Sequence, residues 1–257
     1  MLIDTHIHLD ATEYAETRNK VIEDARATGV ATFVLPGVSP ANFAPVQALA
    51  EQHQDVVPAY GIHPLYVGDT DESGLEQLRA QLQNGGAVAV GEIGLDYFVA
   101  DADRTRQEAF YVAQLKLARE FGLPVLLHIR RAQDDVLKHL RRITVRGGIA
   151  HAFNGSRQQA DTFIAMGFKL GFGGAMTYDG SSRIRALVRD LPLEAIVLET
   201  DGPDIPPAWR PGGPSLPSEL LRYASLVAEL RGDTLERVIA QTGANAVAAL
   251  PGLTGRL

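Results

Sequence analysis

The chain has 257 residues, 46% of them hydrophobic and 21% charged, which suits one globular domain with a substantial core, and we expect a single domain over residues 1–257. It contains no cysteine, which excludes disulfides, thiolate metal sites, iron–sulfur clusters and a cysteine nucleophile, so any metal must be held by nitrogen and oxygen. The 24 basic and 31 acidic residues give a formal charge of −7, which disfavours tight nonspecific binding to duplex nucleic acid.

The beginning of the chain bears on its location. Residues 1–6 lack the charged region and apolar stretch of a signal peptide. No apolar run approaches the roughly 20 residues that a membrane span requires. We therefore expect a cytoplasmic protein without a membrane segment.

Short apolar runs alternate with amphipathic segments along the chain, as in βα units around a parallel sheet. The eight runs are residues 2–3, 31–35, 56–60, 87–90, 125–127, 148–150, 168–172 and 195–198. Eight strands in about 250 residues fit a barrel better than an open doubly wound sheet. No glycine-rich dinucleotide turn or P-loop competes. We predict an α/β fold, the (β/α)8 TIM barrel.

Apolar residues at helical spacing predict helices between and after these runs. The clearest segments are 75–82, 110–121, 218–230 and 234–250. Residues 201–217 contain six prolines and three glycines, which predicts a loop over the barrel mouth rather than a domain linker.

Side chains that can bind metal stand where five of the apolar runs end. They are His6 and His8, Glu92, His128, His151, and Glu199 with Asp201. Because the carboxyl ends of barrel strands open on one mouth, where active sites lie, these side chains should converge. A lone His-x-His is often only hydrogen-bonded, but its repetition at other strand ends favours a metal site.

Four histidines and two carboxylates suit Zn²⁺, Mn²⁺, Co²⁺ or Ni²⁺, and a weakly held Mg²⁺ could also serve. Six ligands are more than one tetrahedral ion needs. Two ions about 3.5–4 Å apart would use His6, His8, Glu92, His128, His151 and Asp201, and leave room for water and substrate. Glu92, at mid-barrel, is the expected bridge. Asp201 is the expected catalytic residue, which accepts the proton of a metal-activated water.

Further polar residues near the strand ends have two readings each. His63 could face substrate or rigidify its loop. Arg130 could hold a phosphate or pair with a carboxylate of the mouth. Glu199 lies deeper than Asp201, and we interpret it as support for a histidine or as a packing partner. Ser156 is expected to be a helix N-cap, and the helix start beside the mouth could also bind an anion.

Two remaining histidines stand apart from this pattern. His53 and His139 fall on predicted helices, away from the strand ends. We interpret both as surface residues.

Along nearly its whole length the chain resembles the TatD-like metal-dependent hydrolases and deoxyribonucleases of the amidohydrolase superfamily. The resemblance is carried by Asp4-Thr5-His6-Ile7-His8-Leu9, Gly61-Ile62-His63-Pro64, Gly91-Glu92-Ile93-Gly94-Leu95-Asp96-Tyr97, Gln107-Glu108 with Phe110 and Gln114-Leu115, His128 with Arg130, His151-Ala152-Phe153-Asn154-Gly155-Ser156, and Glu199-Thr200-Asp201. It implies a (β/α)8 barrel with two metal sites that share one glutamate. The first would use His6, His8, Glu92 and Asp201, and the second Glu92, His128 and His151.

The departures from the family pattern concern the substrate. Family deoxyribonucleases commonly continue Glu-Thr-Asp with Ser-Pro, whereas Gly202 follows Asp201 here. Leu65 stands where many members have a second histidine, and Ala152 where a cysteine is common. The resemblance is to a less characterised branch.

Three functions remain open. The leading one is hydrolysis of a phosphodiester or phosphomonoester, with single-stranded DNA, DNA ends or a small phosphorylated molecule as substrate, and no obligate protein partner is evident. The second is hydrolysis of amide, lactone or ester bonds on the same site, since fold and metal cage do not determine the bond cleaved. The third is a metal-binding scaffold without catalysis.

Overall fold

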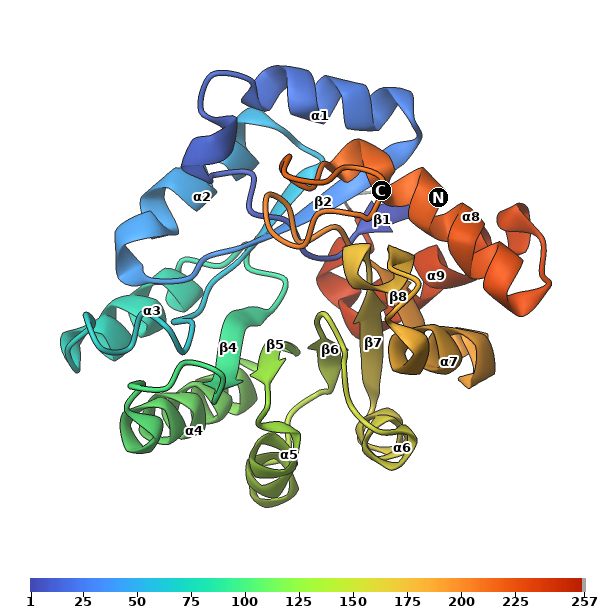
Figure 1. Ribbon diagram of the computed structural model, residues 1–257. Helices are drawn as coiled ribbons and strands as arrows, with labels where there is room; N and C mark the ends of the chain where they lie inside the picture. The colour runs from blue at the N-terminus through green and yellow to red at the C-terminus, as the bar shows by residue number, and fades with distance from the viewer. Residues whose placement is uncertain (256–257) are drawn as a thin grey trace.

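The computed structural model describes residues 1–255 and is a (β/α)8 barrel, seen along its axis in Figure 1. Arg256 and Leu257, the last two residues of the domain predicted over 1–257, lie outside the described range. The strands are β1 (Leu2–Asp4), β2 (Val30–Pro36), β3 (Val56–Ala59), β4 (Val90–Asp96), β5 (Val125–Arg130), β6 (Gly148–Ala150), β7 (Phe168–Phe172) and β8 (Ile196–Leu198).

Within two ladders, neighbouring strands pair in parallel, in the order of the sequence. Strands β1 to β3 form one ladder and β4 to β8 another. A bridge between Tyr60 and Val90 joins β3 to β4, and the Thr5 amide donates to the Leu198 carbonyl at 3.1 Å beside β1 and β8. These two links close the ring.

Helices surround the ring (Figure 1). They are α1 (Arg18–Ala27), α2 (Phe43–Gln52), α3 (Ser73–Gln83), α4 (Arg104–Phe121), α5 (Gln133–Arg142), α6 (Arg157–Ala165), α7 (Ser182–Asp190), α8 (Leu220–Arg231) and α9 (Leu235–Ala249). Short 3₁₀ turns are η1 (Thr12–Tyr14), η2 (Pro40–Asn42), η3 (Gly174–Thr177), η4 (Leu193–Ala195), η5 (Pro217–Glu219) and η6 (Pro251–Leu253). No helix within the described range is long and apolar enough to span a membrane.

The barrel interior is an apolar layer closed at its amino-terminal end. The strand residues in it are Ile3, Val34, Val57, Ala59, Leu126, Ile149 and Val197, and Ala89 joins them from just before β4. Ala246, Leu250 and Leu253, from the end of α9 and from η6, belong to the same cluster. Gly243 lets α9 approach the start of β1, since a Cβ there would overlap the Met1 carbonyl. The opposite end of the barrel is therefore the one open to ligands.

Most predicted strands lie where expected, and 148–150 and 168–172 match β6 and β7. The fourth prediction, 87–90, is wrong in its bounds, because β4 runs from Val90 to Asp96. Two glycines interrupt the apolar pattern there. A Cβ at Gly91 would overlap Leu126, and a Cβ at Gly94 would overlap the backbone of His128, so the close approach of β5 requires glycine at both positions. The apolar side chains that would have indicated a strand are therefore missing there.

The proline-rich loop 201–217 borders the mouth only with its first residues and is otherwise anchored. Trp209 Nε1 donates to Glu219 Oε2 at 2.8 Å. The Tyr178 hydroxyl donates to the Pro206 carbonyl at 2.9 Å. The loop is thus packed against its surroundings rather than spread across the mouth.

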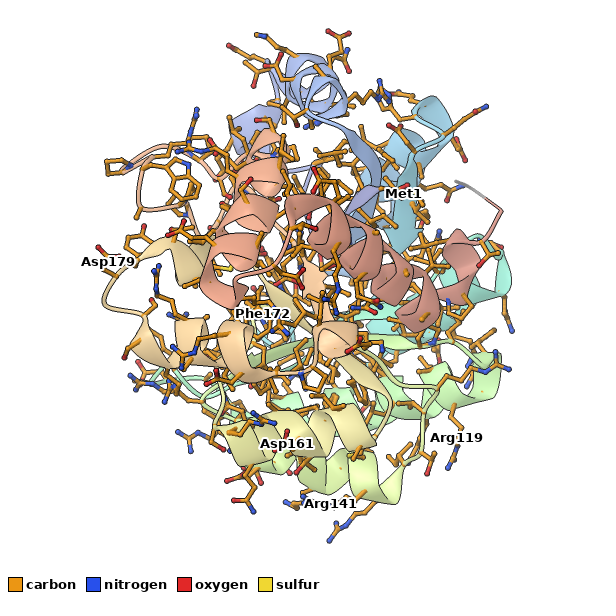
Figure 2. The ribbon with its side chains drawn as sticks, turned by 90° about the vertical axis from the view of Figure 1, so that its right-hand side faces the viewer. Met1, Arg119, Arg141, Asp161, Phe172 and Asp179 are labelled. Carbon is orange, nitrogen blue, oxygen red and sulfur yellow. The ribbon has the colours of Figure 1, made fainter. Side chains whose placement is uncertain are left out.

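The histidines predicted on the surface differ from one another. His53 is half-buried at the end of α2. For His139 the prediction is wrong, because it is 8% exposed and its Nε2 lies 3.0 Å from Glu108 Oε2. The other oxygen of Glu108, Oε1, accepts from the Tyr97 hydroxyl at 3.1 Å. The buried face of α5 extends to His139 because it follows Val136 by one helical turn. Figure 2 shows Arg141 on the outside of the same helix.

Candidate metal centre

A layer of polar side chains stands directly above the apolar interior. His128 follows Leu126 by two residues, His151 follows Ile149, and Glu199 follows Val197; Leu126, Ile149 and Val197 all belong to the barrel interior. Since strand residues two apart face the same way, these polar side chains point up the barrel axis. Alternation along the strands thus places them at the mouth.

His6 and His8 follow β1 rather than belonging to it, since the strand ends at Asp4. Asp4 accepts the Thr200 amide at 3.0 Å and the Thr200 hydroxyl at 2.5 Å, and the His6 amide at 3.3 Å. The Asp201 amide donates to the His6 carbonyl at 2.9 Å. Burial raises the pKa of Asp4 to about 8, although these hydrogen bonds lower it. Through these hydrogen bonds Asp4 joins the two chain segments that carry His6, His8 and Asp201.

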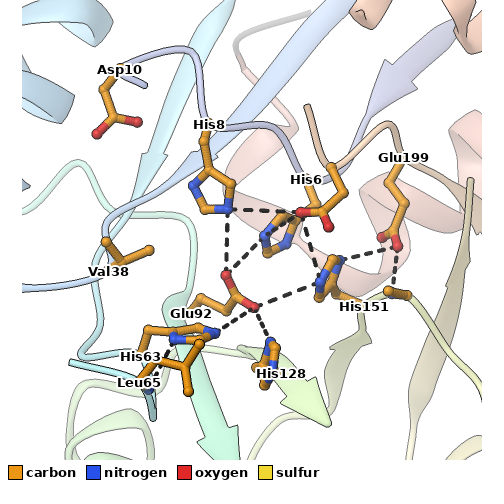
Figure 3. A network of polar contacts seen from close by, with 12 residues as sticks. His6, His8, Asp10, Val38, His63, Leu65, Glu92, His128, His151 and Glu199 are labelled. Atoms are coloured by element: carbon orange, nitrogen blue, oxygen red, sulfur yellow. Dashed lines mark hydrogen bonds and ion pairs between the residues drawn. The ribbon is translucent and has the colours of Figure 1, made fainter. Parts of the chain in front are cut away.

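Glu92 is the centre of the site, 2% exposed and ringed by imidazoles (Figure 3). Its Oε2 atom lies 3.0 Å from His6 Nε2 and 3.6 Å from His8 Nε2. Its Oε1 atom lies 2.9 Å from His128 Nδ1 and 3.7 Å from His151 Nε2. His63 Nε2 lies 3.6 Å from the same Oε1 atom, so each carboxylate oxygen faces a different group of histidines.

Asp201 completes the first of these groups. Its Oδ1 atom lies 3.8 Å from Nε2 of each of His6, His8 and His151. Three sets of donor atoms lie within 4.8 Å of one another: His6, His8 and Asp201; His6, Glu92 and His151; and His63, Glu92 and His128. All six predicted metal ligands are thus brought together.

Asp96 is a site residue that the sequence reasoning missed. Its Oδ2 atom lies 3.1 Å from His128 Nε2, and its Oδ1 accepts the Phe98 amide at 2.8 Å. A carboxylate on Nε2 leaves Nδ1 of His128 as the nitrogen that faces Glu92. The available signal was an acidic residue four positions after Glu92, inside a motif already noted.

Glu199 plays the equivalent part for His151. Its Oε1 atom lies 3.1 Å from His151 Nδ1 and accepts the Ala152 amide at 2.5 Å. Nε2 of His151 is thereby directed at the centre. Gly171 makes the room, because a Cβ there would overlap Glu199. Of the two readings of Glu199, the geometry agrees with support for a histidine.

His63 also reaches the centre, and its predicted role in ordering the loop is confirmed. Its Nδ1 accepts the Leu65 amide at 3.1 Å, which orders the loop, and its Nε2 lies 3.6 Å from Glu92 Oε1. Burial and the neighbouring His128 lower the pKa of His63 to about 3. A neutral ring whose Nδ1 accepts carries its proton on Nε2, so His63 presents a hydrogen-bond donor to the mouth.

The charges of the site fit a bound cation. Burial would raise the pKa of Glu92, but His6, His63 and His128 hold it well below its usual range. Burial raises the pKa of Asp201, and although burial also lowers that of His151, the Asp201 and Glu199 carboxylates raise it to about 10. Buried carboxylates that keep a neighbouring histidine protonated can also stabilise a divalent cation in place of the proton. Such a cation displaces the histidine protons when it binds.

A cavity of about 950 Å³ opens above this centre. Among the described residues, the non-glycine residues with positive φ are Arg131 (57°), Ala152 (43°), Asp201 (52°) and Ile205 (47°). All four line this cavity. Such conformations cost about 1–3 kcal/mol each and gather at functional sites.

Arg130 lines the same cavity. Its guanidinium lies over the Phe98 ring, 3.7 Å from the ring centre. Within residues 1–255 no carboxylate forms an ion pair with it, so the predicted pairing with a mouth carboxylate is not seen. Ser156, beside the mouth, caps α6 as predicted, accepting the Gln159 amide at 3.1 Å.

A (β/α)8 barrel with clustered His, Glu and Asp donors at its carboxyl-terminal mouth fits the class of metal-dependent hydrolases. The profile of the family described as TatD related DNase matches residues 3–251. The chain belongs to this TatD family of metal-dependent hydrolases.

Individual relatives agree. The uncharacterized metal-dependent hydrolase YjjV of Escherichia coli strain K12 is 39% identical over 239 residues, 92% of each chain. The crystal structure of YjjV, a TatD homologue, superposes with a TM-score of 0.94 at 37% identity, over 97% of this chain and 98% of that one. A protein of Erwinia tasmaniensis named 3'-5' ssDNA/RNA exonuclease TatD is 32% identical over 253 residues, 95% of this chain and 98% of its own.

Replacing Glu199 should weaken metal binding without removing a ligand. In Glu199→Gln the acceptor on His151 Nδ1 loses its charge, so the ring becomes a poorer donor, and we expect affinity for Zn²⁺ or Mn²⁺ to fall about 10- to 100-fold. Competition with a chromogenic chelator measures it. Glu194→Gln, an exposed acid just before β8, is the control and should bind as the wild type does. Equal affinities for Glu199→Gln and wild type would contradict the supporting role.

Proposed function

We propose that this chain is a phosphoesterase of the deoxyribonuclease type, which cleaves phosphodiester bonds in single-stranded DNA or at DNA ends with two divalent cations. The observation that carries the proposal is the division of Glu92, whose Oε2 faces His6 and His8 and whose Oε1 faces His128, His151 and His63. A carboxylate placed in this way is suited to bridge two ions.

The ligands divide accordingly. His6, His8, Asp201 and Oε2 of Glu92 would hold one ion. Oε1 of Glu92, Nδ1 of His128 and Nε2 of His151 would hold the other. Zn²⁺, Mn²⁺, Mg²⁺, Co²⁺ and Ni²⁺ are all compatible with these donors. When bound, such ions activate a water molecule and neutralise charge on the substrate.

The protein's own side chains supply the remaining functions. Asp201 would accept the proton of the attacking water, and the raised pKa of its buried carboxyl makes it a better base. His63 would donate from Nε2 to a phosphate oxygen, and Arg130 would bind the phosphate with its guanidinium. All three side chains line the mouth cavity.

Support for a phosphate ester comes from charge and from relatives. Arg130, Arg131 and Arg183 line the cavity of a chain whose formal charge is −7. The family is described as TatD related DNase, and one relative is named 3'-5' ssDNA/RNA exonuclease. Cationic side chains over a metal centre favour an anionic substrate.

We place this activity in the cytoplasm and on one domain over residues 1–257, without an obligate protein partner. The family match over residues 3–251 as one unit supports the single domain. Detection of the protein in a membrane or secreted fraction would contradict the location.

Metal-stripped protein should regain hydrolysis when Mg²⁺, Mn²⁺, Co²⁺, Ni²⁺ or Zn²⁺ is returned. We expect cleavage of single-stranded DNA and of an aryl phosphodiester, no comparable turnover of an aryl acetate, and loss of cleavage in His6→Ala. Product formation with each ion is the measurement.

The other outcomes correspond to the alternatives. Turnover of the acetate alone would replace the phosphoesterase by a hydrolase of amide, lactone or ester bonds. Bound metal with no turnover of any substrate would favour a metal-binding scaffold.

A further inference from the structure

An aromatic ring with two arginines over it borders the mouth cavity. Phe98, on the turn after β4, is 47% exposed. The guanidinium carbons of Arg130 and Arg131, at the end of β5, lie 3.7 Å and 4.6 Å from its ring centre. We call these three residues the Phe98 platform. All three line the cavity.

The two cations of the platform lack a close carboxylate partner, although Arg130 helps to lower the pKa of Asp96 on the neighbouring strand. In the described part of the chain, neither Arg130 nor Arg131 forms an ion pair. The acidic residues of the first turn of α5 are engaged elsewhere: Asp134 accepts from Gln159 at 2.8 Å, and Asp135 lies 3.6 Å from Lys138. Two like charges over one ring repel each other, and an anion between them would relieve that repulsion.

The backbone holds this arrangement at a cost. Arg131 has φ of 57°, a conformation that side-chain-bearing residues rarely adopt. The Tyr97 amide donates to the Arg130 carbonyl at 2.8 Å, which fastens the turn carrying Phe98 to the end of β5. Strain retained beside a metal centre indicates use in binding.

The position of the platform relates it to the reacting centre. Arg130 stands two residues beyond His128 on the same strand, roughly 7 Å along it. That separation is of the order of one nucleotide in an extended strand. A group bound on the platform would therefore neighbour the phosphate at the metal centre.

We propose that the Phe98 platform binds the nucleotide next to the scissile phosphate of a single-stranded nucleic acid. The Arg131 guanidinium would contact its phosphate, and the Phe98 ring would stack its base, while Arg130 stays directed at the scissile phosphate. This inference rests on the proposed function. The platform would then make the enzyme prefer an extended strand to a small diester that has no neighbouring nucleotide.

The kinetic test compares two substrates. We expect kcat/KM of metal-loaded Phe98→Ala and Arg131→Ala on a thymidine tetranucleotide to fall about 10-fold or more, and distinctly less on an aryl phosphodiester. Arg141→Ala, with the same loss of charge on the outer face of α5 (Figure 2), is the control and should match the wild type on both. Equal losses on the two substrates, or none, would overturn the proposal.

A binding test separates failure of the platform from failure of the proposed function. Fluorescence anisotropy of a labelled, cleavage-resistant phosphorothioate thymidine hexamer is measured over a range of salt. For Arg131→Ala we expect the slope of log affinity against log salt to decrease by about 0.7 in magnitude, the value for one phosphate contact. For Phe98→Ala we expect weaker binding at an unchanged slope.

The two tests give distinct results together. If the wild type cleaves neither diester but the binding differences appear, the platform stands and the proposed hydrolysis fails. If the wild type cleaves both diesters and neither variant alters binding, the hydrolysis stands and the platform is overturned.

Discussion

Glu92→Gln should abolish hydrolysis while leaving the barrel folded. Glutamine keeps the volume of the side chain but loses the charge that two ions would share, and its amide nitrogen cannot ligate a cation. We expect kcat/KM on an aryl phosphodiester to fall by about 10³-fold or more, which corresponds to several kcal/mol of lost transition-state stabilisation. Metal content after gel filtration should fall in parallel.

The control for this variant is a test that the protein remains folded. Far-ultraviolet circular dichroism and a cooperative thermal transition should persist, because the apolar interior lies below Glu92 and is closed by α9 and η6. An unfolded Glu92→Gln protein would indicate a structural metal site instead. Full activity in a folded variant would remove the bridging role altogether.

Asp201→Asn should lose turnover even when metal is supplied in excess. If the Asp201 carboxylate accepts the proton of the attacking water, the side-chain amide of asparagine cannot take over that role, and kcat should fall about 10²- to 10⁴-fold. The measurement is kcat at saturating Mn²⁺ and saturating aryl phosphodiester. Asp204→Asn, an exposed acid of the same cavity that forms no ion pair in the described residues, should show little change.

The dependence on metal concentration separates the two roles of Asp201. Recovery of wild-type kcat at high Mn²⁺ would mean that Asp201 acts as a ligand alone. A low kcat that no metal concentration restores is the result expected of a proton acceptor.

His128 and His151 show how far these roles depend on the orientation of each ring. Asp96 on Nε2 turns His128 to present Nδ1, whereas Glu199 on Nδ1 turns His151 to present Nε2. The two rings therefore face Glu92 with different nitrogens. Carboxylates behind the rings would set both the geometry and the basicity of the second set of ligands.

The barrel and the six candidate ligands could be predicted from the sequence because local patterns of apolar and polar residues indicate both. Apolar runs of strand length at βα spacing indicate the barrel. A polar residue directly after such a run, such as His151, marks the carboxyl end of a strand and so the mouth. This reasoning needs no knowledge of which strands are neighbours.

Contacts between distant segments were decided only by the tertiary structure. Asp4 reaches Thr200 across 196 positions, and Asp96 reaches His128 across 32. Nothing in the local pattern of either segment specifies such a partner, because it arises from ring closure and from strand register. The bounds of β4 were hidden for the same reason, since Gly91 and Gly94 are required by the neighbouring β5. The local sequence thus determines which residues can reach the mouth of the barrel. The closure and register of the strands determine which atoms of those side chains face one another.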